Sequence, residues 1–241
     1  MSLDGKHVLI TGAARRIGRS IALAIAKAGG IVLVHYNESE SEAQSLVETI
    51  AEQGGVAYIL HANLAIPDQS TELIAEATRY GQLYALINNA AIFEALDWQT
   101  TSLEAWNRHL AINLTSPFLL CQAFARQLPA SETGRIINLL DWRALRPGAD
   151  HLPYTVSKAA LAALTRALAI SLAPNITVNG IALGAILPPA DGSDTAPILK
   201  NMPVKRWAAL EEVAQTILFL LDGPAYITGE IIHLDGGRHL V

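Results

Sequence analysis

Short apolar runs alternate with longer segments of helical periodicity along the whole chain, and this alternation limits the possible folds more than any other feature. The apolar runs are rich in Val, Ile and Leu with little polar alternation, as in parallel strands buried on both faces of a sheet. Strands are predicted at 7–10, 31–35, 56–60, 85–87, 135–140, 176–181 and 230–234, and helices at 17–28, 40–53, 68–79, 103–128, 154–172 and 209–221. The pattern predicts a doubly wound α/β fold.

The composition fits one domain without a membrane or nucleic-acid partner. A chain of 241 residues, 51% of them hydrophobic, buries a substantial core, and no linker or repeat divides residues 1–241. The net charge of −5 gives no positive field for nucleic acid. Because the N-terminus lacks a signal-peptide pattern and no uninterrupted apolar run is long enough to cross a bilayer, we expect a soluble cytoplasmic protein.

Other features favour packing or loop roles. Cys121 lies in an apolar segment, 118–124, which favours a buried packing thiol over a reactive one. The seven histidines have no metal-site spacing, so no metal is expected. Prolines interrupt the segment 185–203, as in a lid over a site or a disordered loop.

The first predicted strand ends in a glycine-containing turn, Thr11-Gly12-Ala13-Ala14-Arg15-Arg16-Ile17-Gly18, inside which a helix begins. Glycine there lets the backbone approach a pyrophosphate, and the helix N-terminus attracts the anion. By itself the motif also fits an ordinary strand-to-helix turn. Arg15, and the lack of an acid directly after the second strand in His35-Tyr36-Asn37-Glu38-Ser39, favour NADP(H) over NAD(H). Asn37 and Ser39 can donate to a 2′-phosphate, whereas Glu38 would repel it unless it turns to solvent.

Tyr154 and Lys158 lie four residues apart on one predicted helix, so their side chains share a face. A phenol has an ordinary pKa near roughly 10, and a neighbouring ammonium is expected to lower that pKa towards the working pH. The pair then predicts a proton donor and acceptor. Alone, a Tyr-x-x-x-Lys pair also fits a solvated helix face.

Several motifs in order resemble the short-chain dehydrogenase/reductase family over essentially the whole chain. They are the 11–18 turn, Asn88-Asn89-Ala90-Ala91, Asn113, the Tyr154-x-x-x-Lys158 pair, Ile227-Thr228-Gly229 and Asp235-Gly236-Gly237. The resemblance implies a single Rossmann domain with a seven-stranded parallel sheet of order 3-2-1-4-5-6-7, and a homotetramer. It also implies that Lys158 binds the nicotinamide ribose and that Asn113 anchors a water chain to the lysine. The cofactor residues implied are Gly12, Arg15, Arg16, Ile17, Gly18, Tyr36, Asn37, Ser39, Asn63, Leu64, Asn89, Ala90, Tyr154, Lys158, Gly184 and Ile186.

The chain departs from the family pattern at Arg16 for a glycine, Asn63 for an aspartate, Leu183 for a proline and Asp141 for a serine. Arg16 and Asp141 resemble the pteridine reductase branch. A serine donates to a ketone oxygen, whereas an ionised carboxylate only accepts. Asp141 therefore suits a substrate with N–H groups, or acts as a donor when protonated; a structural acceptor role is the alternative.

Further residues are interpreted as substrate-binding. Phe93 matches the aromatic residue that stacks on the pterin in pteridine reductases, and Arg16 is placed beside both phosphate and substrate. A plain loop phenylalanine and a pure phosphate role are the alternatives. Arg143 and Arg146 could meet an acidic substrate tail or simply face solvent.

The sequence thus predicts an NADPH-dependent reductase of a pterin or dihydrofolate-like small molecule, with Asp141, Tyr154, Lys158 and Asn113 as catalytic residues and Arg16, Phe93, Asp141 and Tyr154 at the substrate. Two alternatives stay open. One is a 3-oxoacyl-[acyl-carrier-protein] reductase or another ketone or alcohol dehydrogenase, and the other is a non-catalytic NADP-binding regulator.

Overall fold

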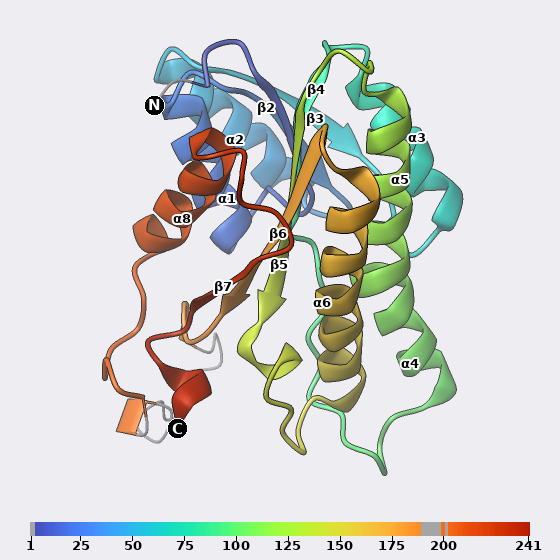
Figure 1. The fold of residues 1–241 in the computed structure, drawn as a ribbon, viewed down its shortest axis with the longest axis vertical. Coiled ribbons are helices and arrows are strands. Elements are labelled where there is room, and N and C mark those ends of the chain that lie inside the picture. The colour runs from blue at the N-terminus through green and yellow to red at the C-terminus, as the bar shows by residue number, and fades with distance from the viewer. Residues whose placement is uncertain (1–2, 189–198, 201) are drawn as a thin grey trace.

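Parallel strands form one sheet in the order β3-β2-β1-β4-β5-β6-β7, which confirms the predicted topology (Figure 1). The computed structural model describes residues 3–188, 199–200 and 202–241. The strands are β1 His7–Ile10, β2 Ile31–Tyr36, β3 Val56–His61, β4 Leu83–Asn88, β5 Gly134–Asp141, β6 Ile176–Leu183 and β7 Ile231–Leu234. The strand order reverses between β1 and β4, where an open α/β sheet leaves a crevice at the carboxyl ends of its strands.

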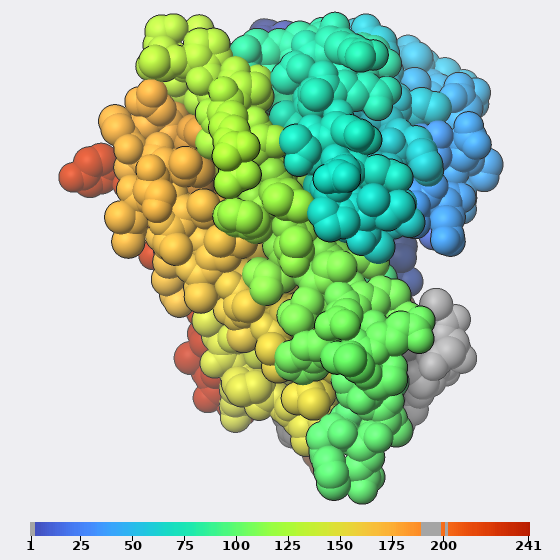
Figure 2. All heavy atoms as spheres, turned by 90° about the vertical axis from the view of Figure 1, so that its right-hand side faces the viewer, coloured from blue at the N-terminus to red at the C-terminus, as the bar shows by residue number. Residues whose placement is uncertain are grey.

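Helices cover both faces of the sheet. On one face lie α1 Arg16–Lys27, α2 Glu40–Glu52 and α8 Leu210–Asp222. On the other lie α3 Pro67–Ala77, α4 Leu103–Leu110, α5 Ser116–Gln127 and α6 Leu152–Leu172, and Figure 2 shows α3, α5 and α6 side by side at the surface of this layer.

The core is divided between the two helix layers by the pleat of the sheet. Val8 and Ile10 of β1 pack into the cluster with α1 and α2, whereas Leu9 packs into the cluster with α3 and α5. Successive strand side chains point to opposite faces, so a central strand with apolar residues at every position holds both layers. The unbroken apolar runs of the sequence have this origin.

Element ends differ slightly from prediction, and one helix is interrupted. The helix predicted at 103–128 consists of α4, a π-helical turn Ala111–Thr115 and α5. The residue Asn113, buried in that turn, bonds to a neighbouring loop. Strand β5 extends to Asp141, so this residue lies at the strand's carboxyl end.

Helix α6 has the length and mean hydropathy (1.3) of a membrane span, but it packs on the sheet as a layer helix. Its buried face carries Thr155, Ser157 and Lys158, a polar set that suits contact with a site. Most of the predicted irregular segment 185–203 lies outside the described residues; of its described part, Ala185, Ile186 and Met202 are buried.

Candidate active site

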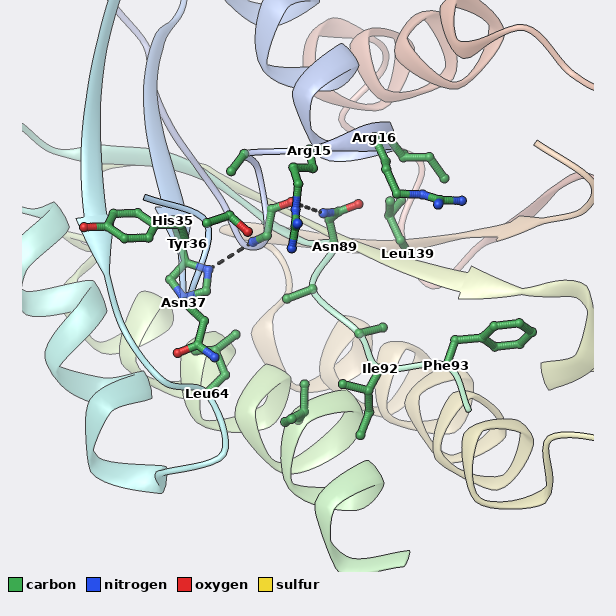
Figure 3. Close-up of a pocket in the computed structure, with 18 of the residues that line it drawn as sticks. Arg15, Arg16, His35, Tyr36, Asn37, Leu64, Asn89, Ile92, Phe93 and Leu139 are labelled. Atoms are coloured by element: carbon green, nitrogen blue, oxygen red, sulfur yellow. Dashed lines mark hydrogen bonds between the residues drawn. The ribbon is translucent and has the colours of Figure 1, made fainter. Parts of the chain in front are cut away.

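A cleft of about 660 Å³ opens at the carboxyl ends of β1, β2 and β4 (Figure 3). It lies where the strand order reverses, the position at which open α/β sheets bind ligands. Its lining includes the predicted residues Gly12, Arg15, Arg16, Ile17, Gly18, Tyr36, Asn37, Ser39, Asn63, Leu64, Asn89, Ala90, Phe93, Tyr154 and Lys158. The two remaining cofactor candidates, Gly184 and Ile186, do not line it, whereas their neighbour Leu183 does.

The glycine-containing turn is shaped for close approach of a ligand backbone. Gly12 has φ +61°, a left-handed conformation that favours glycine. At Gly18 a Cβ would lie 2.3 Å from the Gly12 carbonyl oxygen. The Asn89 side-chain amide donates to the carbonyl oxygens of Thr11 and Gly12, at 2.7 and 2.9 Å, and so ties the turn to β4.

His35 is a residue of this site that sequence reasoning missed. Its Nδ1 accepts a hydrogen bond from the Gly12 amide at 3.0 Å, and its Nε2 donates to the Ala62 carbonyl at 3.0 Å (Figure 3). Burial lowers the pKa of His35 to about 4, so the ring is neutral at neutral pH, as an acceptor at Nδ1 must be. A histidine at a strand end carries no signal in the sequence that separates this role from ordinary packing.

Both arginines of the turn lie at the cleft. Arg16 has φ 54°, so it adopts the left-handed conformation expected of the glycine that it replaces. That conformation costs a non-glycine residue about 1 kcal/mol or more, which is tolerated where the side chain is needed. Arg15 is exposed and lies 3.4 Å from Glu42 of α2, beside the loop that contains Asn37. Such an exposed pair stabilises little and leaves the guanidinium free to bind an anion.

Of the four catalytic candidates, Tyr154 and Lys158 line the cleft, whereas Asp141 and Asn113 do not. The Tyr154 hydroxyl donates to Asp141 Oδ2 at 3.3 Å, and the Arg143 amide donates to Asp141 Oδ1 at 2.9 Å. Lys158 is buried and donates from Nζ to the Leu139 carbonyl at 2.7 Å. The hydroxyl of Tyr154 and the ammonium of Lys158 therefore lie at the cleft, and the Asp141 carboxylate contacts the hydroxyl from beside it.

The expected lowering of the tyrosine pKa is wrong for this structure. Burial and the Asp141 carboxylate raise the pKa of Tyr154 well above 10. The reason is geometric, because Lys158 Nζ lies 5.8 Å from the tyrosine ring centroid and bonds to a backbone carbonyl. Burial lowers the pKa of Lys158 itself to about 8. Tyr154 is therefore fully protonated at neutral pH, the state of a proton donor.

Asn113 supports the substrate side of the cleft. Its amide bonds to both the N–H and the C=O of Ile92, at 2.9 and 3.0 Å, and donates to Ser157 Oγ at 3.1 Å. Ser157 in turn donates to the Tyr154 carbonyl. Asn113 thus joins the loop before Phe93 to the helix that carries Tyr154; its water-chain role stays a prediction.

Phe93 lines the cleft as predicted, whereas the two loop arginines have different surroundings from each other. The ring of Phe93 stacks on His151 at 4.0 Å and meets Tyr154 edge-on at 4.6 Å. Arg143 is largely buried and pairs with Asp150 at 2.8 Å, so the solvated alternative is wrong for it. Arg146 is exposed and donates to the Arg238 carbonyl at 3.3 Å. Among residues 3–188, 199–200 and 202–241, no group of His, Cys, Asp and Glu is placed to hold a metal ion; a metal-free reaction stays a prediction.

The cleft fits a nicotinamide dinucleotide. The left-handed Gly12, the crowded Gly18 and the N-terminus of α1 form a cradle for a pyrophosphate, and the Tyr154–Lys158 pair lines the same cleft. Fold and cleft together define a Rossmann-type protein whose dinucleotide-sized cleft is lined by a tyrosine–lysine pair.

Comparison with known proteins identifies the family. Residues 12–239 match the family model described as Enoyl-(Acyl carrier protein) reductase. The 3-oxoacyl-[acyl-carrier-protein] reductase of a Synechocystis species is 34% identical, with 98% of each chain covered. The structure of FolM alternative dihydrofolate reductase 1 from Brucella canis complexed with NADP has a TM-score of 0.92 at 34% identity, covering 100% of this chain and 97% of that one. A short-chain dehydrogenase from Burkholderia cenocepacia in complex with NADP has a TM-score of 0.93 at 33% identity, with 99% of each covered. The chain belongs to the short-chain dehydrogenase/reductase family and is an NAD(P)-dependent oxidoreductase, which confirms the predicted enzyme class.

Proposed function

We propose that this protein is an NADPH-dependent reductase of a C=N bond in a pterin or dihydrofolate-like substrate. The observation that carries the proposal is the contact between the Tyr154 hydroxyl and Asp141 Oδ2 at 3.3 Å. It puts a hydrogen-bond acceptor beside the proton donor, where a ketone reductase of this family would have a serine donor. A nitrogen heterocycle offers both an N–H to donate and a basic nitrogen to protonate.

NADP(H) is the cofactor that the cleft and the relatives favour. Arg15, Asn37 and Ser39 line the end of the cleft beside α2, where a 2′-phosphate would find a cation and neutral polar groups. Glu38 also lines that end and is exposed, so its carboxylate can remain in solvent. The Brucella canis and Burkholderia cenocepacia relatives are NADP complexes.

In the proposed reaction the reduced nicotinamide supplies a hydride to carbon, and the protein supplies the proton. Tyr154 donates its hydroxyl proton to the substrate nitrogen, because its raised pKa keeps it protonated until the nitrogen becomes basic. Asp141 accepts an N–H of the substrate and orients the ring. Lys158 provides a buried cation close to the tyrosine ring.

A 3-oxoacyl-[acyl-carrier-protein] reductase is the second candidate. The Synechocystis relative and a Staphylococcus epidermidis relative at 33% identity carry that name. A ketone reduced here would develop negative charge on oxygen next to the Asp141 carboxylate, which disfavours the transition state unless Asp141 is protonated. This electrostatic conflict is the reason for preferring the nitrogen substrate.

The deciding experiment is an assay of NADPH oxidation by the purified protein with dihydrobiopterin, dihydrofolate and an acetoacetyl thioester. Turnover of either dihydropterin above the thioester supports the proposal. Thioester turnover with no dihydropterin turnover would establish the second candidate instead.

Changing Asp141 to Ser tests the residue that distinguishes the two functions. A lost hydrogen bond to a charged group costs about 1.5–3 kcal/mol, so we expect kcat/KM for dihydrobiopterin to fall about 10- to 150-fold. Thioester reduction should rise, because the serine hydroxyl can donate to the carbonyl oxygen. The Kd for NADPH should be unchanged. An unaltered ratio of the two activities would assign Asp141 a structural role.

A further inference from the structure

The Phe93 ring at the substrate end of the cleft is held by a neighbour to which no role has been assigned. His151 lies parallel to it, with ring centroids 4.0 Å apart and an angle of 11° between the planes. Phe93 lines the cleft, whereas His151 does not. His151 therefore packs on one face of the ring from outside the cleft lining, and the phenylalanine is still 54% exposed.

The imidazole is hydrogen-bonded to a carboxylate that is itself held by an arginine. His151 Nδ1 lies 3.0 Å from Asp150 Oδ2, and the same oxygen accepts from Arg143 Nη2 at 2.8 Å. The Arg143 side chain is only 13% exposed, and its Cζ lies 5.8 Å from the Phe93 ring centroid. An ion pair and a hydrogen bond thus fix the ring that backs Phe93.

The backbone at His151 is also unusual. It has φ 54° and ψ 45°, the left-handed region, at the residue directly before α6. This conformation is uncommon for non-glycine residues, although histidine, like asparagine, adopts it more often than most. It sets the direction in which the imidazole leaves the backbone, towards Phe93.

Phe93 meets Tyr154 edge-on at 4.6 Å, so its orientation is coupled to the proton donor. A ring held by a stack on one face and an edge contact presents its free face in a fixed plane. A planar ligand gains more from a fixed ring than from a mobile one, because less side-chain freedom is lost on binding.

We propose that His151 is a specificity-determining positioning residue, which holds Phe93 as a rigid wall of the cleft and so selects planar heteroaromatic substrates over flexible aliphatic ones. The inference rests on the proposed function, since it names the feature of the substrate that the cleft selects. His151 does not itself touch the substrate; it acts through Phe93.

The test compares variants that remove or keep the ring. His151→Asn and His151→Gly delete the imidazole and suit the left-handed backbone, whereas His151→Phe keeps a ring of similar size. The matched control is Tyr80→Asn, which deletes one ring of the Tyr58–Tyr80 stack (4.3 Å), a pair that does not line the cleft. Thermal unfolding and the NADPH Kd verify that each variant is folded.

The first readout is steady-state kinetics with dihydrobiopterin. The ring-free variants should raise KM about three- to tenfold, the size of one aromatic contact, with kcat within about twofold of wild type. His151→Phe and Tyr80→Asn should keep the wild-type KM. Equal KM values in His151→Asn, His151→Gly and wild type would overturn the proposal, as would a His151→Phe variant that behaves like the ring-free ones.

The second readout is calorimetric binding of oxidised biopterin to the enzyme with NADP⁺, which requires no turnover. Weaker biopterin binding to His151→Asn, with binding retained in His151→Phe, supports the role of His151. This result would hold even if the wild type did not reduce dihydrobiopterin, and then only the proposed reaction would fail. Equal binding to all variants overturns the inference alone. A wild type that binds no biopterin overturns both.

Discussion

Tyr154, Lys158 and Asp141 lie close together at a largely buried position and form the proposed proton-donating group. In the structure the carboxylate, not the ammonium, is the direct partner of the hydroxyl, at 3.3 Å. Burial and that carboxylate raise the pKa of Tyr154, so the tyrosine is protonated at neutral pH, as the proposed proton donor must be. The sequence was sufficient to find these residues, because their spacing is fixed by one helix and one strand end. It could not give the direction of the pKa shift, which depends on burial and on which group lies nearer.

Replacement of Tyr154 by Phe removes the proposed proton donor while keeping the ring that packs on Phe93. We expect kcat to fall about 100- to 10,000-fold, the usual contribution of a general acid. The Kd for NADPH, measured by fluorescence titration, should stay within about twofold because the pyrophosphate cradle is untouched. Lost cofactor binding in a folded variant would contradict the assigned role.

The pH dependence of kcat/KM should report the ionisation of Lys158. Burial lowers its pKa to about 8, whereas the pKa of Tyr154 is raised well above 10. The ammonium is charged below pH 8 and neutral above it, so kcat/KM should fall as the pH rises through about 8 if the reaction needs the cation.

Lys158→Arg keeps a cation at all accessible pH values. The alkaline fall in its kcat/KM should therefore shift to higher pH, even if its maximal rate is lower. The measurement is kcat/KM from pH 6 to 10 for both proteins. Identical alkaline limbs would assign that ionisation to another group.

At the scale of elements, the glycine-containing turn is held by two hydrogen bonds from residues of neighbouring strand ends, which we call the Gly12 clamp. Asn89 follows β4 and His35 belongs to β2, and both bond to the turn backbone at Gly12. The turn itself was evident from its glycines and the following helical period. The clamp was not, because the partners of a backbone N–H are set by how β1 and β2 pair in space.

The Gly12 clamp predicts loss of stability in acid. The folded-state pKa of about 4 lies below the ordinary value of 6.5, so the unfolded state takes up the proton first as pH falls. The contribution of His35 is complete above pH 6.5 and is lost between pH 6.5 and 4, on the order of 3 kcal/mol in total.

Urea unfolding at pH 7, 5.5 and 4.5 measures this loss. His35→Asn, whose amide oxygen can still accept from Gly12, should show a shallower decline in the free energy of unfolding over that range. Parallel declines in the two proteins would indicate that other groups dominate acid unfolding.

Element prediction succeeded where periodicity is strong and failed where side chains reorganise the backbone. The strands were located within two residues, because each is rich in apolar residues with little polar alternation. The π-helical turn at Ala111–Thr115 was not predicted, since the helical period runs through it. Its cause is tertiary, because Asn113 bonds to Ile92, a residue of a different loop.

For the whole molecule, the sheet order brings distant segments of the chain to one cleft. Residues of the first turn, the loop after β4 and helix α6 line the same cavity although they are far apart in sequence. The alternation of elements predicts the layers, and the family resemblance supplied the order of strands. Neither the alternation nor the resemblance predicted that His151 would stack on Phe93, because that contact depends on the path of a loop with no periodic pattern.

The predicted homotetramer is the remaining expectation at this scale. Large apolar side chains are exposed on α4 and α5, notably Leu103 (75%) and Phe118 (39%), and Figure 2 shows both helices at the surface. Exposed apolar groups on neighbouring helices are typical of a contact surface, and a closed assembly of identical chains would bury them. Light scattering after size-exclusion chromatography should therefore give four times the chain mass.

Leu103→Glu and Phe118→Glu should each shift the distribution towards dimers or monomers, because a carboxylate would be buried in the contact. The control Val56→Glu places the same charge at an exposed apolar residue of β3, at the opposite edge of the sheet from β7, and should leave the mass unchanged. A wild-type protein of single-chain mass would contradict the tetramer. A tetramer that survives both glutamates would place its contacts on other surfaces than α4 and α5.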